Sequence, residues 1–165
     1  MTTIAVIGAG QMGAGIAQVA AAKGNDVLLA DIDLATAEKA KGGIEKGLGK
    51  LVAREKIAAA DAEATVARIT PVGDYARFAE AAFVIEAATE REEVKRAIFE
   101  KAGAVLAADA ILASNTSSIP ITRMAAHTAD PSRFIGLHFF NPVPLMPLIE
   151  IIPGLATSAE TTQRT

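Results

Sequence analysis

His138 and Glu150 are the two residues whose types and spacing most directly suggest proton-transfer chemistry. The stretch GLHFFNPVP places His138, one of only two histidines, at the end of an apolar run. Three prolines between the two residues disrupt regular strand pairing, so the chain must turn before it returns in PLIEII. The return brings Glu150 beside His138, and a His–Glu pair fixes the imidazole tautomer and raises the basicity of the ring.

Each member of this pair also has a simpler interpretation. His138 could be a hydrogen-bonded core residue, and Glu150 could be a solvent-facing strand residue. The position of His138 at the carboxyl end of a predicted strand favours chemistry, because ligands of open α/β sheets bind at that edge. We further expect Glu150 to be buried against the ring, since buried glutamates are rare unless they are paired.

A glycine-rich turn near the N-terminus predicts a phosphate-binding loop. Gly8, Gly10 and Gly13 form the pattern G-x-G-x-x-G between a predicted strand and a predicted helix. The first glycine permits a tight turn, the second admits a pyrophosphate to the backbone, and the third lets helix and strand pack closely. The helix N-terminus adds free N–H groups and a positive dipole end. We include Gln11 and Met12, inside the same pattern, among the cofactor-binding residues.

Asp31 supplies the second part of a dinucleotide site. It ends the second predicted strand, about 20 residues after the glycine loop. A carboxylate there accepts hydrogen bonds from both ribose hydroxyls and repels a 2′-phosphate, which favours NAD over NADP. The alternative is an ordinary strand-end aspartate near tight-turn glycines, but the strand–turn–helix context favours the dinucleotide interpretation.

Other polar residues follow predicted strands at the same edge. Glu90 follows AFVIEAA, Asn115 and Ser117 lie in the SNTSS cluster after AILA, and Asn141 follows RFIGLHFF. Because the carboxyl ends of parallel strands meet at one edge, we expect these side chains along one crevice, next to the nicotinamide. Ser117 could hold the oxygen of a bound substrate, or the cluster could simply cap the following helix; residue chemistry alone favours neither.

The segments that must position these residues alternate between strand and helix patterns. Short apolar or β-branched runs predict strands at TIAVIG, DVLLAD, RITPV, AFVIEAA, AILASN, RFIGLHFF and PLIEII. Helical patterns lie between most of them. The alternation predicts an α/β fold: a Rossmann-like, doubly wound, mostly parallel sheet with helices on both faces.

Two helical segments carry more detailed expectations. A helical excursion follows the second strand, over residues 34 to about 68, and we expect its four glycines to interrupt it. Asp61 should restart the helix as an N-cap. The segment REEVKRAIFEKAGAVLA predicts an amphipathic helix whose inward face carries Val94, Ile98 and Val105.

Composition narrows the class of protein. The 165 residues fit one domain, and the formal net charge of −3 gives no support for a nucleic-acid partner. There is no cysteine, and no metal-ligand cluster stands out, so we expect neither disulfides nor a metal. No signal sequence and no apolar run of about 20 residues is present, so we expect a soluble cytoplasmic protein without a membrane partner.

Three stretches together resemble a known family. VIGAGQMGAGIAQVAA, ASNTSS and GLHFFNPVPLMPLIEII look like the NAD-binding domain of L-3-hydroxyacyl-CoA dehydrogenases, including the 3-hydroxybutyryl-CoA type. The resemblance covers essentially the whole chain, and the last stretch is the most specific. It implies NAD as cofactor and an acyl-CoA as substrate. It also implies that His138 is the general acid/base, that Glu150 orients it, and that Ser117 binds the substrate oxygen.

The resemblance assigns further residues to the same site. Asn115 is expected beside the nicotinamide and the substrate, and Asn141 is expected to contact the substrate. Glu90 and Lys95 match positions that contact the cofactor in this family.

The resemblance also extends beyond the chain. The family has a second, helical domain that completes the acyl-CoA pocket and makes most of a homodimer interface. The final stretch ATSAETTQRT reads as an N-cap and the first turn of a helix, so we expect more protein beyond Thr165. Residues 1–165 would then be the NAD-binding domain alone.

A basic stripe is a candidate site for the CoA tail. Lys46, Lys50 and Arg54 recur every four residues and therefore lie on one face of a helix. Lys50 and Arg54 could meet CoA phosphates. A solvated basic face is the alternative, and with the family resemblance the two interpretations are nearly balanced.

Three functional hypotheses follow. The parent protein is an NAD-dependent 3-hydroxyacyl-CoA dehydrogenase, or the chain by itself is a module that binds NAD without turnover. In the third, it is a related dehydrogenase of a free hydroxy acid, such as the lambda-crystallin-like sugar-acid dehydrogenases. The stretch HFFNPVP argues against the third, because those relatives vary this segment.

Overall fold

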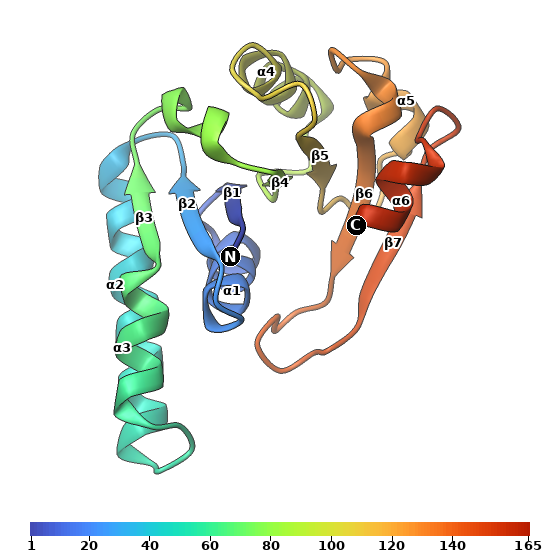
Figure 1. Cartoon of the computed structure of the whole chain (residues 1–165). Helices are drawn as coiled ribbons and strands as arrows, with labels where there is room; N and C mark the ends of the chain where they lie inside the picture. Colours follow the sequence, from blue (N-terminus) through green and yellow to red (C-terminus); the bar gives the residue numbers. More distant parts are fainter.

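Short runs of apolar residues form the seven strands of one sheet (Figure 1). The computed structural model describes all residues 1–165. The strands are β1 (Thr3–Ile7), β2 (Asp26–Ala30), β3 (Ile69–Val72), β4 (Phe83–Glu86), β5 (Ile111–Ser114), β6 (Phe134–Phe139) and β7 (Ile149–Pro153). Their order in the sheet is β3-β2-β1-β4-β5-β6-β7. All neighbours are parallel except β7, which runs antiparallel to β6. The predicted fold class is therefore confirmed.

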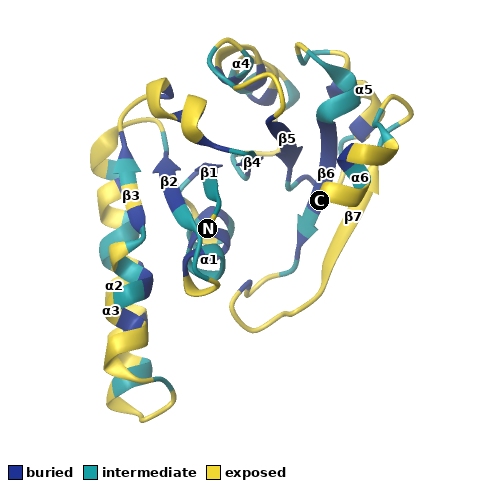
Figure 2. Cartoon of the chain, viewed as in Figure 1, coloured by how far each residue is buried: buried dark blue, intermediate teal, exposed yellow.

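Helices cover both faces of the sheet. Successive residues of a strand point to opposite faces, so an apolar strand presents apolar side chains on both, and each face is covered by its own helices. Val6 packs with Ile16 in a core that lies against one set of helices, whereas Ile7 packs with Phe99 in a second core on the other face. The first set is α1 (Gln11–Ala22), α2 (Leu34–Ala53) and α3 (Ala59–Ala67). The second is η1 (Ala76–Glu80), α4 (Glu92–Gly103) and α5 (Ile121–Ala125). Figure 2 shows the buried central strands between these layers. No helix is long and apolar enough to cross a bilayer.

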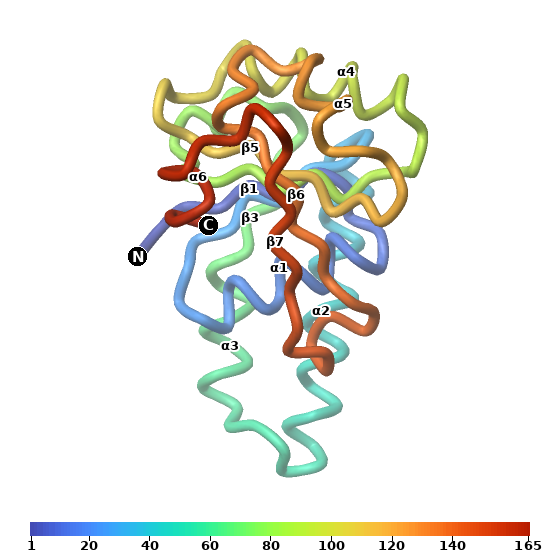
Figure 3. Tube along the Cα trace, turned by 90° about the vertical axis from the view of Figure 1, so that its right-hand side faces the viewer, coloured from blue at the N-terminus to red at the C-terminus, as the bar shows by residue number.

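The helical excursion after β2 differs from its prediction. α2 runs without a break through all four glycines, because its Ala37, Ile44 and Leu48 pack into the core and tertiary packing outweighs low helix propensity. Asp61 does not cap α3; it lies in the first turn, and Ala58 occupies the N-cap position. Figure 3 shows α2 and α3 projecting together as a helical hairpin away from the sheet.

α4 also turns a different face inward than predicted. Its fully buried residues are Lys95, Phe99 and Ala102, a row spaced four and three residues apart. Ile98 and Val105 are only partly buried against the same core. Val94 instead faces an open cleft beside the glycine loop. The hydrophobic pattern favoured the wrong row because the inward row contains a lysine, which is rarely buried without a partner.

The segment between β6 and β7, residues 140–148, forms a proline loop that packs against α1. Gly15 of α1 makes this contact possible, because a Cβ there would lie 2.9 Å from Cβ of Val143. The predicted turn and the predicted return strand are both confirmed. β7 itself is exposed along its whole length, as its colour in Figure 2 shows.

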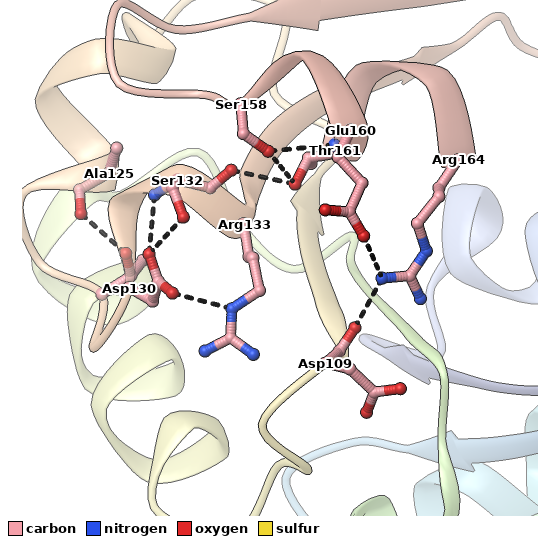
Figure 4. Close-up of polar contacts among 10 residues, drawn as sticks. Asp109, Ala125, Asp130, Ser132, Arg133, Ser158, Glu160, Thr161 and Arg164 are labelled. Atoms are coloured by element: carbon pink, nitrogen blue, oxygen red, sulfur yellow. Dashed lines mark hydrogen bonds and ion pairs between the residues drawn. The ribbon is translucent and has the colours of Figure 1, made fainter.

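The last helix, α6 (Ala159–Arg164), is held against the body of the domain by polar contacts (Figure 4). The predicted N-cap and helical turn are present: Ser158 caps the helix by accepting from the Thr161 N–H at 3.0 Å. The carbonyl of Ser132, in the short helix η2 (Pro131–Arg133), accepts from the Ser158 N–H and the Thr161 hydroxyl. Arg164 donates to the carbonyl of Asp109 at 3.0 Å. These contacts tie the C-terminal segment to η2, just before β6, and to the loop just before β5.

Candidate active site

The strand order places a crevice where the connections diverge. After β1 the chain passes to α1 on one face, and after β4, the neighbour of β1, it passes to α4 on the other. Such switch points are where open α/β sheets bind ligands. A cleft of about 680 Å³ lies there, within the usual size of a cofactor site. It brings together five predicted cofactor residues: Gly8, Gly10, Gln11, Met12 and Asp31.

The glycine loop has the close packing that its pattern predicts. Gly8 adopts φ +100°, and a Cβ there would lie 2.6 Å from the carbonyl oxygen of Ala87. A Cβ on Gly13 would lie only 1.6 Å from the carbonyl oxygen of Gly8. Gly10 is the N-cap of α1, with open space beside it, so the free N–H groups of the helix face the cleft. The loop therefore fits a pyrophosphate.

Asp31 is oriented by the loop that it faces. One carboxylate oxygen accepts from the Ala9 N–H, and the other accepts from the Ile32 N–H at 2.7 Å. These bonds direct the carboxylate into the cleft at the end of β2. Ile32, beside it, is 89% exposed and offers an apolar surface in the same cleft. The pair suits a ribose carrying a flat base.

The cleft also contains the only tyrosine of the chain. Tyr75 is nearly buried and stacks on Phe78, with ring centroids 4.6 Å apart. Nζ of Lys101 lies 4.7 Å from the centroid of the Tyr75 ring, in a cation–π contact. Burial, together with the negative charges of Asp31 and Glu86, raises the pKa of Tyr75 to about 12.

A buried ion pair supports the opposite wall. Lys95 donates to both carboxylate oxygens of Glu86 at 2.8 Å, and both side chains are essentially inaccessible to solvent. Glu86 also accepts from the Ser114 hydroxyl and from the Ala88 N–H. Glu86 thus fixes the turn that places Ala87 over Gly8. Lys95 contacts this carboxylate and does not line the cleft, although the resemblance suggested a cofactor contact.

His138 and Glu150 meet as predicted. They pair in register across β6 and β7, and Nδ1 of His138 lies 2.8 Å from a carboxylate oxygen of Glu150. Since a carboxylate only accepts, Nδ1 carries a proton, and in the neutral form of the ring the lone pair is therefore on Nε2. The expectation that Glu150 is buried was wrong, because its side chain is 51% exposed on the edge strand. The side chain of Phe140 packs beside the imidazole at 4.7 Å between ring centroids.

The polar cluster after β5 divides into distinct roles. Thr116 and Ser118 donate to one carboxylate oxygen of Glu90, at 2.7 and 3.2 Å. The hydroxyl of Ser117 is exposed and makes no hydrogen bond within the chain. Oδ1 of Asn115 accepts from the N–H of Phe139 at 2.8 Å. Ser118 does not cap α5, whose N-cap position is held by Pro120 without a side-chain bond.

Asn141 lines a second cavity, whose lining does not include His138. This cavity, of about 400 Å³, is bounded by α1, α2 and the proline loop. It shares Gly10 and Gln11 with the cofactor cleft, so the two spaces meet at the glycine loop. Gly43 lines its far side from α2. No group of three or more potential ligand side chains is placed to hold a metal ion.

Lys50 lies in the last turn of α2 and Arg54 is its C-cap. Figure 3 shows this helix in the hairpin that projects from the sheet. Both basic residues are exposed, and neither takes part in an ion pair within the chain. Because α2 is unbroken, Lys50 is two turns beyond Gly43 on the same face of the helix. The structure therefore sets the basic stripe beyond the second cavity, apart from His138.

These features define a class. A parallel sheet with its switch point between β1 and β4, a glycine loop under α1, and an oriented acid after β2 make a dinucleotide-binding domain. The sequence pattern of the family described as "3-hydroxyacyl-CoA dehydrogenase, NAD binding domain" matches residues 3–165. The chain belongs to this family and forms its NAD-binding domain.

Individual relatives agree with this assignment. The chain is 49% identical to the 3-hydroxyadipyl-CoA dehydrogenase of Escherichia coli K12, covering 98% of the chain and 34% of the relative. It is 49% identical to a probable 3-hydroxybutyryl-CoA dehydrogenase of Deinococcus radiodurans, covering 94% and 56%. The crystal structure of (S)-3-hydroxybutyryl-CoA dehydrogenase from Ralstonia eutropha superimposes with a TM-score of 0.96 at 42% identity, covering 99% and 58%. The chain thus spans between about a third and three-fifths of these relatives.

Sequence reasoning missed two residues that line the cofactor cleft, Tyr75 and Lys101, and the buried Glu86 behind its wall. Glu86 reads as the polar end of a strand, and its pairing with Lys95 depends on how α4 rotates over the sheet. Tyr75 and Lys101 come from segments 26 residues apart, and no local pattern links them. A signal did exist for Glu86, because a carboxylate within the apolar run FVIEAA needs a buried partner.

Proposed function

We propose that this domain serves an oxidoreductase that transfers a hydride between NAD and C3 of an L-3-hydroxyacyl-CoA, with the 3-oxoacyl-CoA as product. The observation that carries the proposal is the His138–Glu150 pair. His138 lies near the carboxyl end of β6, at the edge of the sheet where the glycine loop follows β1. The names of relatives acting on 3-hydroxybutyryl-CoA and 3-hydroxyadipyl-CoA support the substrate class.

In this mechanism His138 moves the proton. Its Nδ1–H is held by Glu150, so the lone pair on Nε2 accepts the proton of the 3-hydroxyl. Glu150 stabilises the imidazolium that forms, and the charged ring returns the proton in the reverse direction. NAD, when bound, supplies the nicotinamide carbon that accepts the hydride. Positioned proton transfer of this kind contributes about 10²–10⁴-fold in rate.

Other predicted site residues would bind and orient the ligands. We assign the free hydroxyl of Ser117 to the substrate oxygen, because it is exposed and has no partner within the chain. Asn141, beside the second cavity, would contact the acyl-CoA. Glu90 would contact the cofactor, held in place by Thr116. Lys95 would act on the cofactor site indirectly, because it holds the Glu86 carboxylate in place behind the wall of the cleft.

The basic stripe would bind the CoA tail. The second cavity opens from the glycine loop toward α2, and Lys50 and Arg54 follow it along the same helix. These two cations, which form no ion pair within the chain, could bind the phosphate groups of CoA. A double variant, Lys50→Ala with Arg54→Ala, should weaken the binding of CoA thioesters but leave the binding of NADH unchanged.

The parent protein would be longer than this chain. We infer that a helical domain follows it, completes the acyl-CoA pocket and makes a homodimer, because the relatives extend well beyond the matched region. The exposed isoleucines of β7 would lie against that added part. The chain by itself would then bind NAD without turnover.

Calorimetric titration with NADH and then acetoacetyl-CoA, followed by an assay of NADH absorbance, tests these assignments. Binding of NADH without turnover is expected for the chain alone, and turnover is expected from the longer parent protein. Absence of NADH binding would overturn the proposal. A parent protein that oxidises a free hydroxy acid in preference to its CoA thioester would move it to the related class of dehydrogenases.

A further inference from the structure

Asn115 makes a contact that neither the glycine loop nor the His138–Glu150 pair accounts for. Its Oδ1 accepts from the backbone N–H of Phe139 at 2.8 Å, across 24 residues of sequence. Phe139 directly follows His138 in the chain. The half-buried asparagine therefore joins the end of β5 to the last residue of β6, immediately beside the imidazole.

The sheet topology explains why this contact matters. The paired register between β5 and β6 ends at Ser114 and Gly136, whereas β6 continues to Phe139. On its other side, β6 stays paired with β7 through His138 and Phe139. Over its last residues, β6 thus has a strand along only one edge. The Asn115 side chain takes the place of the missing rung on the other edge, because an amide oxygen can substitute for a backbone carbonyl.

We propose that Asn115 is a positioning residue that fixes the backbone of His138 by extending the β5–β6 ladder with its side chain. β7 holds the same residue from the opposite edge and also supplies Glu150. The backbone is then held from both edges, and the contact of Nδ1 with Glu150 turns Nε2 away from that carboxylate. The catalytic meaning of this positioning rests on the proposed function, but the contact itself does not.

The contact also fixes which way the Asn115 amide points. A backbone N–H can be bound only by the oxygen of the amide, so Oδ1 faces Phe139 and the NH₂ group faces away. Any contact that Asn115 makes with a ligand must then be a donation from Nδ2. The partner atom is an acceptor, such as the carbonyl oxygen of a carboxamide or of a ketone.

Hydrogen exchange and imidazole NMR on the chain without ligand test the positioning role. Asn115→Ala should accelerate exchange of the Phe139 amide by roughly tenfold or more, because its partner is lost. Asn115→Asp keeps an acceptor at the same reach and should retain protection. The ¹⁵N signals of the His138 ring should move in Asn115→Ala, while those of His127, the only other histidine, stay in place. Ser118→Ala, in the same loop, is the matched control and should change neither.

Unchanged Phe139 protection and unchanged His138 signals in Asn115→Ala would overturn the proposal. If that variant does not fold, Asn115→Ser replaces it, because a serine hydroxyl is too short to reach the Phe139 N–H and should give the same acceleration.

The donor assignment has its own test. Asn115→Asp should weaken NADH binding roughly fivefold or more relative to Pro120→Asp, which adds the same charge to the same loop at an exposed N-cap position. Equal affinity in these two variants would overturn the donor assignment, whereas a wild-type chain that fails to bind NADH would count against the proposed function alone.

Discussion

Asp31 acts at the scale of a single carboxylate, and its role can be isolated by one substitution. Its oxygens are oriented by the N–H groups of Ala9 and Ile32, so the side chain is directed into the cofactor cleft. We expect Asp31→Ala to weaken the binding of NADH far more than the binding of NADPH. The ribose hydroxyls of NADH lose their acceptor, whereas for NADPH the repulsion of the 2′-phosphate disappears. Calorimetric titration with both cofactors measures the ratio. An unchanged preference would refute the ribose assignment.

His138 allows a second test at the residue scale. His138→Gln preserves the approximate size of the side chain but removes the basic nitrogen, so the enzyme proposed above should lose about 10²–10⁴-fold in kcat. NAD affinity should stay nearly constant, because the ring is not part of the cofactor cleft. Steady-state kinetics and NADH titration separate the two effects. A large loss of NADH binding would mean that the histidine is structural.

Tyr75 reports on the electrostatics of the cofactor cleft. Burial and the negative charges of Asp31 and Glu86 raise its pKa to about 12, against a value near 10 in the unfolded chain. The raised pKa makes a contribution to stability that is fully present below pH 10. It is lost as the pH rises from about 10 to about 12, because only the unfolded phenol ionises there. Ultraviolet titration is unambiguous, since the chain has one tyrosine. Ionisation near pH 10 in the folded protein would contradict the prediction.

At the scale of elements, the Glu86–Lys95 pair ties β4 to α4. Breaking one partner of a buried ion pair leaves an uncompensated charge, so Lys95→Met should lower the free energy of unfolding by about 3–5 kcal/mol. The exposed Arg96–Glu100 pair on the same helix is the matched control, and Arg96→Ala should cost less than about 1 kcal/mol. Denaturant unfolding measures both. Equal effects of the two substitutions would mean that burial does not govern the pair.

The same pair shows where sequence reasoning about elements ends. Strand positions and the glycine loop could be predicted because apolar runs and turn glycines act over a few neighbouring residues. The rotation of α4, which buries Lys95 and leaves Val94 partly exposed, depends on a partner nine residues away on the sheet. The continuity of α2 through its glycines likewise depends on packing against the core.

The candidate site divides in the same way. The His138–Glu150 pairing could be predicted because the prolines between them dictate a turn and therefore the return of the chain. The exposure of Glu150 could not, because it depends on what lies beyond β7, the last strand of the sheet. The Asn115–Phe139 hydrogen bond could not be predicted either. It depends on the pairing of β5 with β6 ending at Gly136 while β6 itself continues to Phe139.

At the scale of the whole molecule, the sheet ends in an apolar edge. β7 is exposed throughout, and alternation along the strand places Ile149 and Ile151 on one face, 42% and 45% exposed. The neighbouring Leu148 is 56% exposed. An open edge strand with an apolar face is a template for association. Exposed isoleucines on an open edge strand are suited to being covered by other protein.

The chain alone should therefore self-associate through β7. We expect its apparent mass in light scattering to rise with concentration, because pairing of this edge removes apolar surface from water. Ile149→Thr with Ile151→Thr retains high strand propensity and should lower the apparent mass toward that of one chain. Leu155→Thr, at a residue that is 92% exposed and lies beyond the strand, is the matched control and should leave association unchanged. A wild-type chain that stays monomeric at every concentration would contradict the prediction.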